Sequence, residues 1–283
     1  GAIGGALAAG LMGSDGGVNI SYDNGRTADH YVNLPVGELW GVGVDQDQPY
    51  NVYAGMQDHD SWKGPSNGWS GSVTIADWVT VREGDGMYNK VDPTDSRWLY
   101  NTREFGDHKR VDQTLRTMTD IMPRRPKGQP PLRWNWNTPL AISPHNPQIV
   151  YTGAQVLLRS LNRGDAWQEI SPDLTTNDPE KVFGRGNIQH CTITTVSESP
   201  VTPGVIWVGT DDGRVQVTKT HGSTWTDATP AIAKAGGPAD RWVTRVLASS
   251  LDAGTAYAAK SGYRHDDRKP YLLKTTDYGA TWT

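Results

Sequence analysis

The chain repeats a pattern about every 50 residues, and this repeat restricts its possible folds more than any other feature. In the first half of each repeat, a short apolar run leads through a polar turn to a second apolar run that contains an aromatic residue. The aromatic residues of the second runs are Tyr53, Tyr100, Tyr151, Trp207 and Tyr257. Two short apolar runs joined by a turn predict two neighbouring antiparallel strands in every repeat.

The second half of the repeat has the pattern of a tight hairpin. It contains Ser or Thr, then an Asp-like residue two positions later, Gly after two more, and usually Trp three positions after the Gly. The Asp-like side chain can accept backbone N–H bonds within the turn, and Gly supplies a positive φ. The copies span Ser21–Gly25, Ser160–Trp167, Thr218–Trp225 and Thr275–Trp282.

This hairpin pattern resembles the Asp-box of BNR-repeat β-propellers. That group includes bacterial sialidases, xyloglucanase-type glycoside hydrolases, sortilin-type receptors and photosystem assembly factors. The stretches most similar to sortilin-like bacterial proteins, which are commonly described as glycosyl hydrolases, are Asp15–Gly17, Pro49–Tyr53, Gln57–Asp58 with Ser61–Pro65, and Ser171–Thr175. The resemblance covers the whole chain and implies a secreted protein, extracellular or periplasmic.

We therefore expect an all-β fold, a β-propeller of four-stranded blades with Asp-box turns, over residues 1–283. The repeat count predicts about five blades and a partial one, with a first strand over Leu7–Met12. No hairpin copy lies between Tyr53 and Tyr151, so we expect that two blades have diverged. The copy at Ser21 has Ala28 where Trp is expected. Either the partial blades close one ring, or residues outside this chain complete a larger propeller; we expect the second.

Composition narrows the classes of partner. The net charge of −4 provides no electrostatic reason to expect nucleic acid, and no run of residues is long and apolar enough to span a membrane. The chain has 12 Trp and 11 Tyr but only 2 Phe. Trp and Tyr have an apolar ring and a polar tip, so this composition favours aromatic residues at half-exposed positions and binding faces. Cys191 stands alone in the sequence, so an intrachain disulfide is excluded, and we expect it to be buried.

In a propeller, the loops that enter the innermost strand of each blade gather at one end of the axis, together with the loops joining the second and third strands. Ligands of propellers usually bind there, so these loops are the candidate site. The predicted ligand-binding residues are Trp40, Trp62, Trp69, Tyr88, Arg133, Trp134, Trp136, Gln189, His190, Arg241 and Trp242. A long loop insert over 57–77 contains two of these tryptophans. It is either part of the site or a surface loop whose tryptophans pack on a neighbouring blade.

Glycoside hydrolysis uses two carboxylates. The candidates on this face are Asp58, Asp60, Asp85 and Glu38, and we predict the three aspartates as the catalytic residues. The alternative is that Asp58 and Asp85 only bond loop backbone. No sialidase arginine triad can be assigned, and the xyloglucanase arrangement needs two propellers. No metal-ligand spacing surrounds His190, and we expect neither a metal nor a cofactor.

Two functions follow from these features. The first is a secreted propeller that binds carbohydrate at the loop face, with hydrolysis left open. The second is a non-catalytic propeller of sortilin-like type that binds a protein or peptide. The sequence contains no complete catalytic set that would decide between an enzyme and a binding protein.

Overall fold

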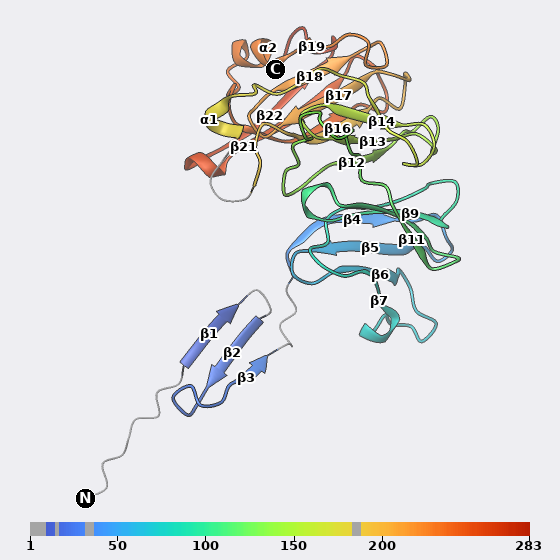
Figure 1. Ribbon diagram of the computed structural model, residues 1–283, viewed down its shortest axis with the longest axis vertical. Helices are drawn as coiled ribbons and strands as arrows, with labels where there is room; N and C mark the ends of the chain where they lie inside the picture. Colours follow the sequence, from blue (N-terminus) through green and yellow to red (C-terminus); the bar gives the residue numbers. More distant parts are fainter. Residues whose placement is uncertain (1–9, 15–16, 32–36, 183–187) are drawn as a thin grey trace, which may run out of the picture.

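The computed structural model describes residues 10–14, 17–31, 37–182 and 188–283, and its regular structure is dominated by β-strands (Figure 1). The strands are β1 (Gly10–Ser14), β2 (Gly17–Ser21), β3 (Asp29–Tyr31), β4 (Leu39–Val44), β5 (Asn51–Met56), β6 (Ser61–Pro65), β7 (Val79–Arg82), β8 (Asn89–Val91), β9 (Trp98–Thr102), β10 (His108–Asp112), β11 (Thr117–Asp120), β12 (Leu140–Ile142), β13 (Val150–Gly153), β14 (Leu157–Ser160), β15 (Gln168–Glu169), β16 (Ile193–Glu198), β17 (Ile206–Thr210), β18 (Val215–Thr218), β19 (Thr226–Asp227), β20 (Trp242–Ala248), β21 (Ala256–Gly262) and β22 (Asp267–Thr275). Short helical segments are η1 (Ile75–Asp77), η2 (Glu104–Gly106), α1 (Pro179–Val182), α2 (Thr229–Lys234) and η3 (Tyr263–His265). None of the described helices is long and apolar enough to cross a membrane.

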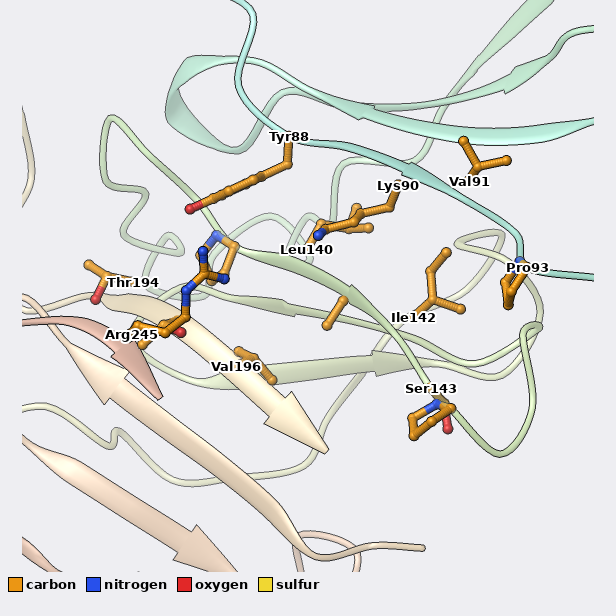
Figure 2. Close-up of a pocket in the computed structure, with 14 residues that line it drawn as sticks. Tyr88, Lys90, Val91, Pro93, Leu140, Ile142, Ser143, Thr194, Val196 and Arg245 are labelled. Atoms are coloured by element: carbon orange, nitrogen blue, oxygen red, sulfur yellow. The ribbon is translucent and has the colours of Figure 1, made fainter. Parts of the chain in front are cut away.

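The strands form six antiparallel sheets, each built from strands that follow one another in the chain. Four sheets have four strands and two have three, and the first strand of each sheet lies at its edge. The first strands of the five sheets from β4 onward pack side by side, β4 against β8, β8 against β12, β12 against β16 and β16 against β20. These five strands therefore line a common axis, with a cavity between β8, β12 and β16 (Figure 2), whereas the sheet of β1, β2 and β3 lies apart from them (Figure 1). This arrangement is a β-propeller, which confirms the predicted fold, and the described sheets do not close a ring.

The strand pairs agree closely with the repeat. The pair predicted around Val42 and Val52 forms β4 and β5, with Val42 opposite Ala54 and Val44 opposite Val52. Two predicted segments need comment. Strand β1, Gly10–Ser14, overlaps the predicted Leu7–Met12 strand, and residues 7–9 of that prediction lie outside the described residues. Strand β6 lies within the stretch 57–77, so the part of that stretch outside the sheet is shorter than the sequence indicated.

The four hairpin turns share one hydrogen-bond pattern. In the turn after β14, Ser160 Oγ accepts from Gly164 N at 2.8 Å, and Asn162 Oδ1 accepts from Ala166 N at 2.9 Å. Equivalent bonds link the Ser or Thr hydroxyl to the Gly, and the third residue of the turn to the seventh, in the other copies, at Ser21, Thr218 and Thr275. The side chains therefore satisfy backbone donors that the strands leave unpaired.

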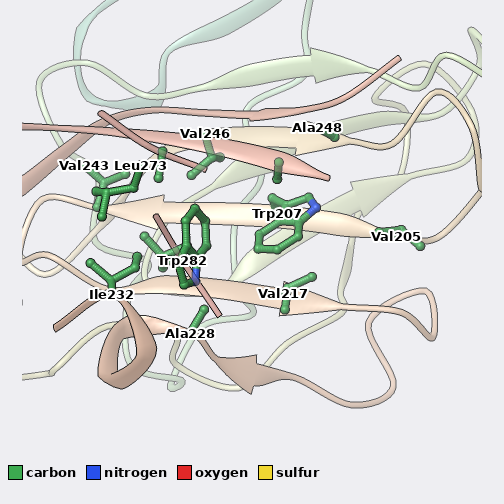
Figure 3. Packing of buried hydrophobic residues seen from close by; sticks show 13 residues of the cluster. Val205, Trp207, Val217, Ala228, Ile232, Val243, Val246, Ala248, Leu273 and Trp282 are labelled. Carbon is green, nitrogen blue, oxygen red and sulfur yellow. The ribbon is translucent and has the colours of Figure 1, made fainter. Parts of the chain in front are cut away.

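The hydrophobic core lies in layers between neighbouring sheets. The layer between the sheets that begin with β16 and β20 contains Trp207 and Trp282, whose ring centroids are 6.0 Å apart in an edge-to-face arrangement (Figure 3). The turn tryptophans also tie adjacent sheets together, because Trp167 Nε1 donates to Ile121 O at 2.7 Å and Trp225 Nε1 donates to Ile170 O at 3.1 Å. The sheets from β4 onward thus depend on their neighbours for burial.

Candidate functional site

A cavity of about 930 Å³ opens where the loops enter the first strands of the blades. Its size is in the range of small-molecule sites. Five of the predicted residues come together in its wall although they lie far apart in the sequence: Trp40, Tyr88, Trp136, His190 and Trp242. Glu38, Gln57, Tyr263 and Arg264 also line it. We call this cavity the mouth pocket.

Irregularities in the first strands direct side chains into the mouth pocket. The register of β4 against β5 shifts between Leu39 and Gly41, which leaves Trp40 as the extra residue. The same kind of shift leaves Thr194 extra in β16 and Thr244 extra in β20. All three residues line the pocket. A β-bulge re-aims a side chain relative to the regular alternation, so this repeated irregularity shapes the wall.

The aromatic rings are held by polar and edge contacts. Trp40 Nε1 donates to Gln57 Oε1 at 3.2 Å, and Asn137 Nδ2 donates to Tyr88 Oη at 3.3 Å. The guanidinium carbon of Arg264 lies 4.5 Å from the ring centroid of Trp242, a cation–π contact. These contacts restrict the rings and leave part of each surface exposed, because Trp40, Tyr88 and Trp242 are only half-buried.

A buried carboxylate lies behind His190. The Nδ1 atom of His190 is 3.4 Å from Asp211 Oδ2, and the imidazole meets Trp242 edge-to-face at 6.4 Å. Asp211 also accepts from Asn135 Nδ2 at 2.9 Å, from Thr192 N at 2.9 Å and from Thr192 Oγ1 at 3.0 Å. Asp211 was not among the residues predicted from the sequence, although it directly follows β17 just as Gln57 directly follows β5. That equivalence is the signal that could have identified it.

The predicted catalytic carboxylates lie in the loops beside the mouth pocket rather than in its wall. Asp85 Oδ1 accepts from the backbone N of Asp58 at 2.9 Å, and Asp60 Oδ1 accepts from Gly84 N at 2.8 Å. These two bonds join the loop before β6 to the loop before β8. Among the described residues that line the pocket, Glu38 is the one carboxylate, and it is exposed.

The remaining predicted ligand residues do not line the mouth pocket. Trp134 is buried in a core cluster, and Gln189 Oε1 accepts from its backbone N at 3.0 Å. Arg133 forms an ion pair with Asp173 at 2.7 Å, and Arg241 forms one with Asp240 at 2.8 Å. Trp62 Nε1 donates to His59 O at 2.6 Å, and Trp69 is fully exposed. Of the segment that contains Arg133 and Trp134, only the end, Asn135–Asn137, reaches the pocket.

Neither the cysteine nor the metal-ligating residue types add a second reactive centre among the described residues. Cys191 is buried, and burial raises the pKa of its thiol to about 11, so it is a structural residue rather than a nucleophile. No group of three or more His, Cys, Asp or Glu side chains in the described part of the chain is placed to hold a metal ion.

Comparison with known proteins supports the fold and leaves the activity open. No protein-family profile and no curated protein matches the chain. An ancestral GH74 enzyme matches with a TM-score of 0.61 at 15% identity, over 97% of this chain and 36% of that one. The extracellular domain of a hybrid two component system from B. thetaiotaomicron matches with a TM-score of 0.57 at 13% identity, over 98% of this chain and 31% of that one. Sqt1 from Chaetomium thermophilum matches with a TM-score of 0.52 at 16% identity, over 88% of this chain and 63% of that one.

The chain thus spans about a third of the length of the first two of these structures, and less than two thirds of the third. At these identities the likeness is one of fold. The chain is a β-propeller whose fold is shared with glycoside hydrolases of GH74 and with other propeller proteins.

Proposed function

We propose that this propeller binds carbohydrate in the mouth pocket. The observation that carries the proposal is the convergence of Trp40, Tyr88, Trp136, Trp242 and Tyr263 in one cavity. Sugar rings present flat C–H faces that pack on aromatic rings, while their hydroxyls need hydrogen-bond partners. Gln57, Asn137 and Glu38 supply such partners in the same wall.

We further infer that the four hairpin turns are Asp-boxes, and that the chain is a BNR-repeat propeller of sortilin-like type. The inference rests on the shared hydrogen bonds of the turns at Ser21, Ser160, Thr218 and Thr275. It carries with it an extracellular or periplasmic location and further blades outside this chain. Asp-boxes stabilise blades and perform no chemistry, so the inference supports the binding proposal only through the fold.

Hydrolysis is a second candidate, with Asp58, Asp60 and Asp85 as its proposed acids. It is favoured by their position in loops adjoining Gln57, at the edge of the mouth pocket. Hydrolysis needs two carboxylates facing each other across the substrate, at about 5–10 Å. The bonds from Gly84 N and Asp58 N engage one oxygen of Asp60 and one of Asp85, which favours binding without turnover.

The test is a glycan array followed by calorimetry on the glycans that bind. Replacing Trp242 or Tyr263 with Ala should weaken binding at least tenfold, since each removes a ring from the pocket wall. Tyr263 is exposed, so its replacement leaves the core intact, and Trp69→Ala is the matched control because Trp69 is exposed outside the pocket. Equal binding by the Tyr263 and Trp242 variants and the wild type would refute the proposal.

Two further assays on the wild-type protein test hydrolysis and the binding of a protein or peptide. Release of reducing sugar by the wild type, lost in Asp60→Asn or Asp85→Asn, would establish hydrolysis. Retention of an unmodified peptide or protein, with no glycan bound by the array, would establish the protein-binding alternative instead.

A further inference from the structure

A second cavity, of about 310 Å³, lies along the axis next to the mouth pocket. Its wall is formed by the first strands β8, β12, β16 and β20 (Figure 2). Tyr88 and Thr194 line both cavities, so the two spaces adjoin. We call the second one the axial cavity. A ligand held in the mouth pocket can therefore extend toward it.

Two cationic side chains from opposite sides project into the axial cavity. Lys90 comes from β8 and Arg245 from β20, and Figure 2 shows both directed into the space below Tyr88. Lys90 Nζ lies 5.8 Å from the ring centroid of Tyr88. No Asp or Glu lines the cavity, and within the described residues neither cation has an ion pair.

Arg245 is exposed to solvent, whereas Lys90 is half-buried, and the absence of an ion pair distinguishes Lys90 from other partly buried cations of the fold. Arg82 pairs with Asp107, and Arg163 Nη2 lies 3.0 Å from Asp92 Oδ2. Lys260 donates to Gly213 O at 2.8 Å and to Pro238 O at 2.6 Å. These three side chains have acceptors from the protein, as buried charges generally do.

The positive charges of Lys90 and Arg245 also repel each other. Burial lowers the pKa of the Lys90 ammonium, and the charge of Arg245 lowers it further. Two like charges that converge in a cleft without a counter-charge raise the local positive potential. An anion between them would remove the repulsion and gain charge-assisted hydrogen bonds from both sides.

We propose that Lys90 and Arg245 form a binding site for an oxyanion in the axial cavity. The ligand group is a carboxylate, sulfate or phosphate, which accepts from the ammonium on one side and from the guanidinium on the other. This group is either a free ion or the acidic substituent of a carbohydrate seated in the mouth pocket. The second source rests on the proposed carbohydrate function, whereas the oxyanion site itself does not.

The first experiment uses inorganic phosphate as the probe. Calorimetric titration at constant ionic strength, adjusted with chloride, should detect saturable binding to the wild type. Lys90→Met and Arg245→Met should each weaken phosphate binding at least tenfold, since each removes a charge-assisted hydrogen bond. Lys219→Met is the matched control, because Lys219 is exposed and also lies over a tyrosine ring, that of Tyr278 at 5.1 Å, outside both cavities.

A stability readout separates loss of the site from loss of the fold. Phosphate should raise the melting temperature of the wild type and of Lys219→Met, and should leave that of the two axial variants unchanged. Without phosphate, Lys90→Met should melt no lower than the wild type because it relieves repulsion. Absence of phosphate binding by the wild type, or unchanged binding by both axial variants, would overturn the proposal.

The second experiment identifies the source of the oxyanion. Uronic-acid oligosaccharides and their neutral counterparts are titrated into the wild type and the two axial variants. Preference for the acidic glycan that disappears in Lys90→Met and Arg245→Met supports the acidic carbohydrate. Equal affinity for both glycans overturns that source. Phosphate binding with no glycan bound in this titration or on the glycan array leaves the oxyanion site standing and rejects the proposed carbohydrate function.

Discussion

The imidazole of His190 lies 3.4 Å, from Nδ1 to Oδ2, from the buried carboxylate of Asp211. His190 precedes β16 and Asp211 follows β17, so the pairing of these two antiparallel strands brings the residues together. Asn135, from the preceding blade, donates to the same carboxylate. The mouth pocket therefore has a histidine whose ring is oriented by groups from two blades.

Asp211→Asn should destabilise the protein and weaken ligand binding. The carboxylate accepts from Thr192 N, Thr192 Oγ1 and Asn135 Nδ2, and an amide can replace only part of these acceptors. We expect a loss of about 1–3 kcal/mol in the free energy of unfolding, measured by urea denaturation. Asp240→Asn is the control, because the Asp240 side chain is largely exposed. Equal stability of the Asp211 variant and the wild type would contradict this role.

Burial of His108 should make the protein less stable in mild acid. His108 is completely buried, with Nε2 2.8 Å from Thr152 Oγ1, and burial lowers its pKa from 6.5 to about 3. Between pH 6.5 and 3, the unfolded chain binds a proton there that the folded chain excludes. The free energy of unfolding therefore falls as the pH falls through this window, by about 2 kcal/mol from His108 between pH 7.5 and 5.

Chemical denaturation at a series of pH values measures this effect. His108→Gln should lose the His108 contribution to the slope whatever its absolute stability. His265→Gln should keep it, because His265 is exposed. A slope that is identical in the wild type and the His108 variant would show that the histidine does not carry the dependence.

Ser160→Ala should weaken its blade without touching the mouth pocket. Ser160 Oγ accepts from Gly164 N at 2.8 Å and lies 2.9 Å from Asn162 Oδ1, and it is buried. Removal leaves a buried N–H without its acceptor, so we expect a loss of about 1 kcal/mol or more in the free energy of unfolding. Ser250→Ala, at an exposed serine, is the control, and glycan affinity should stay unchanged in both variants.

Gly209→Ala should disturb the packing between two blades. A Cβ at this position would lie 2.4 Å from Val243 Cγ1 and 2.8 Å from Thr195 Cγ2, both in first strands. We expect a loss of about 1–3 kcal/mol, measured by thermal or urea denaturation. Gly13→Ala is the comparison, since a Cβ there meets nothing within 4 Å. If the Gly209 variant were as stable as the Gly13 variant, the side chains of Val243 and Thr195 would be able to move aside at little cost, which would contradict the prediction.

The fold was predictable because the local pattern of each blade repeats. The runs that contain Tyr53, Tyr151 and Trp207 predicted strands that the structure contains, since short apolar runs and turn-forming Gly act within a few positions. The convergence of Trp40, Tyr88, Trp136, His190 and Trp242 also followed from the repeat, because equivalent positions of successive blades lie at one end of the axis.

What the sequence determined by itself was therefore the blade, its turns and the end of the axis at which aromatic residues gather. Only the tertiary structure decided which of these residues face the cavity. Trp134 is buried in the core while Trp136, two positions later, reaches the pocket, and bulges turn Trp40 and Thr244 into its wall. The partners of Asp211 and the opposition of Lys90 to Arg245 likewise depend on packing between blades. Such contacts join residues many positions apart, and no local pattern of residues encodes them.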